Sequence, residues 1–224
     1  MADFECALME VTPAFGQDAE SWAGLSPFEV VEFDSHVGFI LKRGSLLVRQ
    51  LKNTKTNLVS LLLSGPQGSG RTSLAAAIGQ ASEFPYIKLI SSDEFVGKGE
   101  DEKVTRIAKI FEDAYKSPQS VIVVDDIERL IDYNAVGPRF SNLVLALRDL
   151  FKKHPPFGHK LMVIATTGEY DKMNQMGVSR VFSEVRHLNL IESTDAIEKV
   201  LEKVSFNAPA MGKIKAAVKD GNFN

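Results

Sequence analysis

Short apolar runs alternate with longer amphipathic segments along most of this chain. Within the runs successive residues are apolar, which is typical of strands buried on both faces of a parallel sheet. Between the runs, apolar residues recur every three or four positions, which favours helices with one buried face. In one early segment the residues in phase are Phe39, Ile40, Arg43, Leu46 and Leu47. The pattern predicts strands at residues 58–63, 86–90, 121–125, 161–165 and 185–190, and helices at residues 37–52, 72–82, 101–116 and 142–153.

The alternation of strands and helices predicts an α/β fold with a doubly wound, parallel, five-stranded sheet. Glycines and prolines interrupt the first part of the chain, and only helical spacing remains after residue 193. We therefore divide the chain into an N-terminal linker with a short helix (residues 1–35), an α/β core (36–191) and a C-terminal helical segment (192–224).

Composition and charge narrow the class of protein. The 224 residues are 44% hydrophobic and 25% charged, as in an ordinary globular protein. A net charge of −3 argues against a dedicated nucleic-acid binder, which usually carries a basic face. Cys6 is the single cysteine, so the usage fits a reducing compartment. No signal peptide is visible and no apolar run approaches the roughly 20 residues of a membrane span, so we expect a cytoplasmic protein without direct membrane insertion.

A glycine-rich segment after the first strand has the spacing of the phosphate-binding P-loop, G-x-x-x-x-G-K-[ST]. Its glycines let the backbone curl so that N–H groups surround phosphate oxygens, and the N-terminus of the next helix adds partial positive charge. The alternatives are a turn without a ligand and a dinucleotide-binding loop, whose G-x-G-x-x-G spacing is absent here. The residues predicted to bind nucleotide in this loop are Gly65, Pro66, Gln67, Gly68, Ser69, Gly70, Arg71, Thr72 and Ser73.

Arg71 stands where the P-loop pattern has lysine. The guanidinium keeps the positive charge, but it is longer, planar and forked, and it can pair with phosphates through two nitrogens. It can also overfill the loop and misplace the terminal phosphate. We therefore expect nucleotide binding to survive in weakened form more readily than hydrolysis.

Two carboxylates follow the third predicted strand, as in the acidic Walker B motif of ATPases. We expect Asp125 to hold Mg²⁺ together with the hydroxyl of Thr72, beside the P-loop. Asp126 stands at the catalytic position that orients the attacking water, where a glutamate is usual. Its side chain is one methylene shorter, and a misplacement of about 1 Å can reduce a rate on the order of 10²-fold. The alternative is a pair of polar residues that only cap a strand.

Longer strings resemble the second ATPase domain of the N-ethylmaleimide-sensitive fusion factor family. The most specific are Asp-Asp-Ile-Glu-Arg at residues 125–129 and Gly-Pro-Arg-Phe-Ser-Asn at residues 137–142. Residues 84–88, 110–117, 152–156 and 165–167 also fit, and the resemblance runs from about residue 10 to residue 205.

This resemblance implies an AAA-type fold in which residues 192–224 begin a small helical lid, and we expect the chain to stop before the lid is complete. It implies ATP and Mg²⁺ as ligands, a homo-hexamer with nucleotide at the subunit interfaces, and tight binding of ATP with little turnover. The parent protein would be an ATP hydrolase that separates SNARE complexes in vesicle fusion and transport. It would join them through a SNAP-type adapter and stay peripheral to membranes. Phe33 would lie against the adenine.

The chain departs from the family pattern at Arg71 and at Gly168. Gly168 aligns with a sensor position that often holds asparagine, for which Thr166 or Thr167 could substitute. Arg139 could reach a neighbouring subunit or lie on the surface, and Arg180 lies near the place of a trans-acting arginine finger.

From these features we predict an ATP-binding, hexamer-forming domain with weak or absent hydrolysis. Three alternatives stay open at this point: a degenerate P-loop scaffold that binds no nucleotide, a fully active AAA ATPase, and a nucleic-acid loader, which the charge disfavours.

Overall fold

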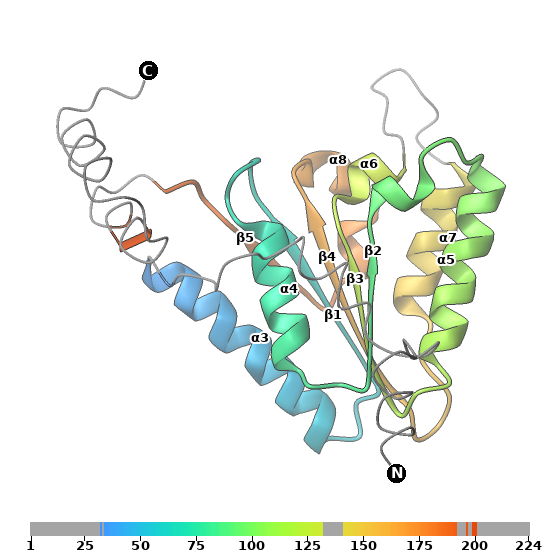
Figure 1. The fold of residues 1–224 in the computed structure, drawn as a ribbon, viewed down its shortest axis with the longest axis horizontal. Coiled ribbons are helices and arrows are strands. Elements are labelled where there is room, and N and C mark those ends of the chain that lie inside the picture. Colours follow the sequence, from blue (N-terminus) through green and yellow to red (C-terminus); the bar gives the residue numbers. More distant parts are fainter. Residues whose placement is uncertain (1–31, 33, 132–140, 192–195, 197–198, 201–224) are drawn as a thin grey trace, which may run out of the picture.

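The computed structural model describes residues 32, 34–131, 141–191, 196 and 199–200. Five parallel strands form one sheet in the order β2-β3-β4-β1-β5, which confirms the predicted doubly wound arrangement. After β1 the chain crosses to the far edge of the sheet, returns through β3 and β4 to β1, and then adds β5 on its other side (Figure 1). The strands are β1 (Leu58–Ser64), β2 (Tyr86–Ile90), β3 (Gln119–Val124), β4 (Lys160–Thr167) and β5 (Glu184–His187).

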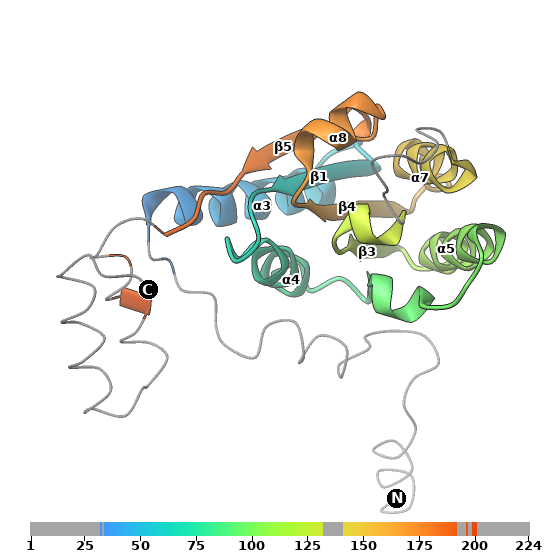
Figure 2. The same cartoon turned by 90° about the horizontal axis from the view of Figure 1, so that it is seen from above.

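Helices cover both faces of the sheet (Figures 1 and 2). Four helices among the described residues are long and agree with the predicted helices to within two residues at each end: α3 (Ser35–Asn53), α4 (Arg71–Ala81), α5 (Glu100–Ala114) and α7 (Asn142–Lys152). Four short ones were not predicted: η1 (Ser92–Phe95), α6 (Ile127–Leu130), α8 (Tyr170–Gln175) and η2 (Ser179–Val181).

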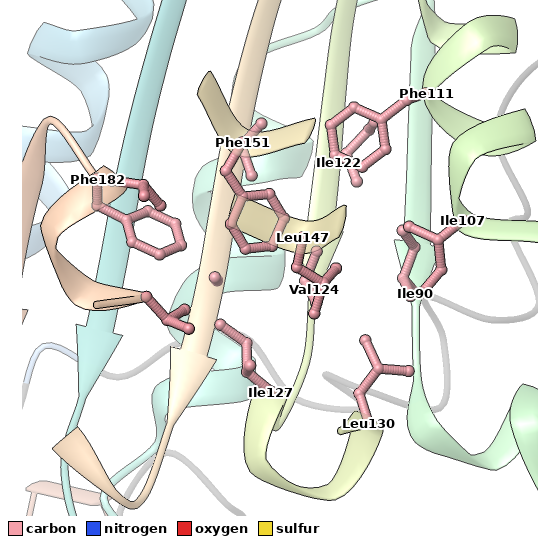
Figure 3. Packing of buried hydrophobic residues seen from close by; sticks show 14 of the residues in the cluster. Ile90, Ile107, Phe111, Ile122, Val124, Ile127, Leu130, Leu147, Phe151 and Phe182 are labelled. Carbon is pink, nitrogen blue, oxygen red and sulfur yellow. The ribbon is translucent and has the colours of Figure 1, made fainter. Parts of the chain in front are cut away.

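The alternation of side chains along each strand divides the core in two. On β3, Val121 and Val123 pack with α3 and α4, whereas Ile122 and Val124 pack with α5 and α7. On the second side, the rings of Phe111, Phe151 and Phe182 form a row across the sheet (Figure 3). The ring centroids of Phe151 and Phe182 are 5.2 Å apart, and those of Phe111 and Phe151 are 6.2 Å apart. Burial on both faces explains why the strands are nearly continuous apolar runs.

The buried face of α3 differs from the sequence prediction. Ile40 and Leu47 are buried as expected, but Phe39 and Leu46 are 52% and 50% exposed. The core-facing stripe passes instead through Gly44, where a Cβ atom would lie 2.7 Å from Ile78. Glycine therefore allows α3 to approach α4 closely, and this rotates the stripe away from Phe39.

Two strands end earlier than predicted. Val124 ends β3, so Asp125 lies beyond it, and β5 ends at His187. Most of the predicted linker (1–35) and C-terminal segment (192–224) lies outside the described residues, so this division of the chain stays a prediction. Among the helices that the structure describes, none is long and apolar enough to cross a membrane.

Candidate functional site

The P-loop lies at the carboxyl end of β1, next to the carboxyl ends of β4 and, beyond it, β3. In Figure 1 this end of the sheet is at the top, beside α6 and α8. A doubly wound sheet binds ligands at this end, where the order of connections reverses. Gly68 and Gly70 have φ of 85° and 82°, a region that glycine enters without steric strain. A Cβ atom on Gly65 would lie 2.5 Å from the carbonyl oxygen of Leu188, so this position also requires glycine.

The loop forms an open cradle with unused polar capacity. Pro66, Gln67, Gly68 and Gly70 are exposed, and no atom lies within 4 Å of a Cβ built on Gly70. Ser69 is only 4% exposed, and its Oγ has no hydrogen-bond partner among the described residues. A buried hydroxyl without a partner is destabilising, and a phosphate oxygen is a suitable acceptor for it. The loop therefore fits the phosphates of a nucleotide.

Thr72 and Asp125 meet as the sequence predicted. The Thr72 hydroxyl donates to Asp125 Oδ1 at 2.8 Å, and Thr166 donates to the same oxygen at 2.7 Å. Oxygen ligands from a hydroxyl and a carboxylate suit Mg²⁺, which keeps most of its water and takes few protein ligands. These two residues would therefore hold the cation that accompanies a nucleotide.

Arg71 turns back into the protein instead of extending into the open loop. Its Nη1 donates to the carbonyl oxygen of Gly65 at 2.6 Å, and its Nη2 donates to Asp126 Oδ1 at 3.1 Å. The residue is 8% exposed. The guanidinium thus joins the start of the P-loop to the predicted catalytic carboxylate, a bridge that its fork makes possible because the two nitrogens point in different directions.

Asp126 is held in a conformation that is unusual for a residue other than glycine. Its φ of 47° lies in the left-handed region, which aspartate tolerates better than most residues. Its backbone N–H donates to Thr166 Oγ1 at 2.8 Å. Burial, followed by the charges of Asp125 and Glu128, raises the pKa of Asp126 above its ordinary value, although Arg71 and Arg129 oppose this shift. The site therefore favours the protonated carboxyl more than water does.

Glu128 is a site residue that the motifs did not indicate. From α6 it accepts hydrogen bonds from Thr167 Oγ1 at 2.8 Å and from the Gly168 backbone N–H at 2.6 Å. It therefore fixes the end of β4, while Thr166 fixes the ends of β3 and β4 to each other. The signal in the sequence was its place in the Asp-Asp-Ile-Glu-Arg string, two residues after Asp126.

A cavity of ≈ 580 Å³ lies beside this site and not over the P-loop. It shares Glu128 and Arg129 with the surroundings of Asp126, and its other walls include Asp93, Lys103 and Glu169. The P-loop itself is an open surface feature, which fits a ligand that a second surface would help to enclose.

The remaining predicted residues divide into described and undescribed positions. Ser73 lies half-buried in the first turn of α4, and Arg180 is exposed in η2, where its role stays a prediction. Phe33 and Arg139 lie outside the described residues.

Comparison with known proteins gives one family and a consistent set of relatives. The AAA family (ATPase family associated with various cellular activities) matches residues 61–190. The vesicular-fusion protein sec18 of Schizosaccharomyces pombe is 43% identical over 90% of this chain and 26% of its own length. The vesicle-fusing ATPase of Arabidopsis thaliana is 44% identical over 92% of this chain and 28% of its own length. The vesicular-fusion protein SEC18 of Saccharomyces cerevisiae is 39% identical over 95% of this chain and 28% of its own length.

These matches confirm the resemblance that the sequence strings indicated. The chain spans about a quarter of the length of these relatives.

Proposed function

The chain belongs to the AAA family of ATPases, and from this premise we propose that it is a nucleotide-binding assembly domain whose ATP turnover is slow or absent. ATP with Mg²⁺ binds at the P-loop and holds copies of the domain together as a hexamer. The domain acts within a longer protein of vesicle fusion and transport. The observation that carries this proposal is the internal bridge of Arg71 beside an open phosphate loop and the paired oxygens of Thr72 and Asp125.

Nucleotide binding is supported by groups that the fold leaves ready for it. The loop backbone is open, and the Ser69 hydroxyl lacks a partner among the residues described. Thr72 and Asp125 already place two oxygens together for the cation. The nucleotide supplies the phosphoryl group and Mg²⁺ its charge neutralisation, and the chain contributes position and N–H donors.

Slow turnover is supported by three features around Asp126. Its side chain is shorter than glutamate, and one of its oxygens is occupied by Arg71 Nη2 at 3.1 Å. Gly168 at the end of β4 offers no side chain to orient a water molecule. Each feature weakens water activation, while Gly68 and Gly70 of the loop stay exposed to a phosphate.

The wider role is supported by the relatives, which are vesicular-fusion proteins and vesicle-fusing ATPases. Within such a protein this domain would form the ATP-dependent ring. Other parts would reach SNARE complexes through a SNAP-type adapter, and those parts would bring the protein to membranes from the cytoplasm. A sensor role for Thr166 or Thr167 and a finger role for Arg180 belong to the same proposal.

Calorimetric titration of the nucleotide-free protein with ATP and Mg²⁺ tests the proposal. Binding at micromolar concentration or tighter, about −8 kcal/mol or better, is expected. ADP serves as a second ligand that shares the loop contacts but lacks the terminal phosphate. The absence of binding heat for both nucleotides at millimolar concentration would overturn the proposal.

That negative result would favour a second candidate function, a scaffold domain that binds no nucleotide. The observation behind it is that Arg71 already has two partners inside the protein, Gly65 and Asp126, and is almost fully buried. In the scaffold, this bridge would be the permanent state of the loop, and copies of the domain would assemble through protein contacts alone.

A further inference from the structure

Gly168 is a glycine for reasons of space. Its φ is outside the left-handed region, so the backbone at this position suits any residue. A Cβ atom there would lie 2.7 Å from Arg71 Nη1 and 3.0 Å from Glu128 Oε1. Real Cβ atoms essentially never approach another atom to 2.7 Å. The guanidinium of Arg71 thus fills the volume that any side chain at residue 168 would enter.

Arg71 and Gly168, the two positions at which the chain departs from the family pattern, therefore lie against each other. Arg71 begins α4, and Gly168 directly follows β4, 97 residues later. The residues next to them in sequence explain neither departure. The bridge to Asp126 and Gly65 holds Nη1 at one place because both nitrogens have fixed partners. A lysine at residue 71 ends in a single compact ammonium and has no second arm to place beside residue 168.

We propose that Gly168 is a positioning residue for Arg71: the side chain missing from the end of β4 makes room for the guanidinium, which then bridges Gly65 and Asp126. A side chain at residue 168 meets Nη1, the nitrogen that donates to Gly65, and so displaces the guanidinium from its bridge between Gly65 and Asp126. The meaning of this pair for nucleotide turnover rests on the proposed function, whereas the packing of Arg71 against Gly168 does not.

A double-mutant cycle on the nucleotide-free protein tests the pair, with thermal unfolding as the readout. Gly168→Ala is expected to lower the unfolding midpoint by roughly 3–8 °C, because it breaks charge-assisted hydrogen bonds of a buried arginine. In the Arg71→Lys background, the same substitution is expected to shift the midpoint by less than about 2 °C, since only the contact with Glu128 must adjust. Gly99→Ala is the control for a glycine-to-alanine change at an ordinary φ without a clash, because no atom lies within 4 Å of its Cβ position. Gly99 is the N-cap of α5, where alanine is disfavoured, so its loss is an upper bound on the effect of the replacement without a clash.

The rescue by Arg71→Lys separates positioning from a general need for glycine. Equal losses from Gly168→Ala in the two backgrounds would overturn the proposal, as would failure of both Gly168→Ala proteins to fold. Folding of the double variant alone would support it. Because no nucleotide is present, the result is independent of whether ATP binds, and a failed ATP titration would leave the pair intact.

Discussion

Arginine and lysine differ at the P-loop mainly in where their donors point. The fork of Arg71 sends one nitrogen to Gly65 and the other to Asp126, so both arms have partners inside the protein. The terminal phosphate of ATP must compete with Gly65 and Asp126 for the guanidinium of Arg71. A lysine ammonium is compact and free to rotate, so it can follow the phosphate.

We therefore expect Arg71→Lys to tighten ATP binding about tenfold, which corresponds to about 1.4 kcal/mol. Calorimetric titration with ATP and Mg²⁺ measures the change, and Arg71→Ala is the control that removes the bridge without supplying a cation. An unchanged affinity in the lysine variant would count against the placement of residue 71 at the phosphates.

Asp126 gives the site a pH dependence with a definite sign. Burial and the charges of Asp125 and Glu128 raise its pKa against the opposing effect of Arg71 and Arg129. The folded state then holds the proton more tightly than the unfolded state, so ionisation of this group removes stability as the pH rises above about 4. The loss is complete above the raised pKa.

Asp126→Asn should therefore stabilise the nucleotide-free protein at pH 7, by on the order of 2 °C in unfolding midpoint, with little effect near pH 4. Asparagine tolerates the left-handed φ of 47° and can still accept from Arg71. Thermal unfolding of both proteins across this pH range checks the expectation. A difference that stays constant with pH would show that the charge is not its cause.

The motifs predicted the P-loop, the two carboxylates and the meeting of Thr72 with Asp125, but not the long-range partners of Arg71 and Glu128. Glycines, a hydroxyl and two carboxylates at fixed spacing identified the P-loop and the acidic strand end. Asp126, one partner of Arg71, lies 55 residues away in sequence, and Gly168, one partner of Glu128, lies 40 residues away. Such contacts depend on which strand ends are adjacent and on the space at Gly168. Neither can be predicted from the residues nearby in sequence.

At the scale of elements, the ends of β3 and β4 are joined by one buried hydroxyl. Thr166 is fully buried, accepts from the Asp126 N–H and donates to Asp125. Valine has the same shape without the hydroxyl, so Thr166→Val leaves a buried donor and a carboxylate oxygen without this partner. We expect it to lower the free energy of unfolding by about 1–3 kcal/mol in urea denaturation. Thr166→Ser keeps the hydroxyl, and an equal loss in that variant would assign the effect to packing.

The start of α7 gives a structural reason for part of the Gly-Pro-Arg-Phe-Ser-Asn string, because Ser141 of that string is the N-cap of the helix. Ser141 caps this helix by accepting from the Val144 N–H at 3.2 Å, and Glu100 of α5 accepts from the preceding donor, the Leu143 N–H, at 2.8 Å. Ser141→Ala is expected to lower the free energy of unfolding by about 1 kcal/mol in urea denaturation. Ser141→Asp restores a capping acceptor and should recover most of the loss; if it does not, the cap contributes little here.

Element prediction worked where the periodic pattern was long. The amphipathic segments that became α5 and α7 repeat their apolar positions over several turns, and the strands are marked by burial on both faces. The short helices η1, α6, α8 and η2 were missed because segments of three to six residues have no measurable period. The face of α3 was wrong in part because the close approach at Gly44 is a tertiary contact.

At the scale of the whole molecule, the order of strands brings distant motifs together. The central position of β1, next to β4 and one strand from β3, places the P-loop, the acidic pair and the end of β4 at one edge. The P-loop is an open surface there, so a bound nucleotide would have one side available to another copy of the domain. A nucleotide that contacts two copies binds more tightly to the assembled state than to the monomer. Its binding therefore favours assembly, and assembly in turn raises its affinity.

We therefore expect ATP and Mg²⁺ to drive this chain from monomers toward hexamers in sedimentation velocity, and the apparent affinity for ATP to rise with protein concentration. The same sample should turn over ATP more slowly than about 1 s⁻¹, the lower end of common enzyme rates. Arg71→Ala is the control for a loss of both effects. Assembly to the same extent with and without nucleotide would favour the scaffold candidate. A protein that stays monomeric at saturating ATP would refute the assembly role. Turnover at or above 1 s⁻¹ would instead mean that Asp126 works as a base despite Arg71, so the arginine bridge must open once nucleotide is bound.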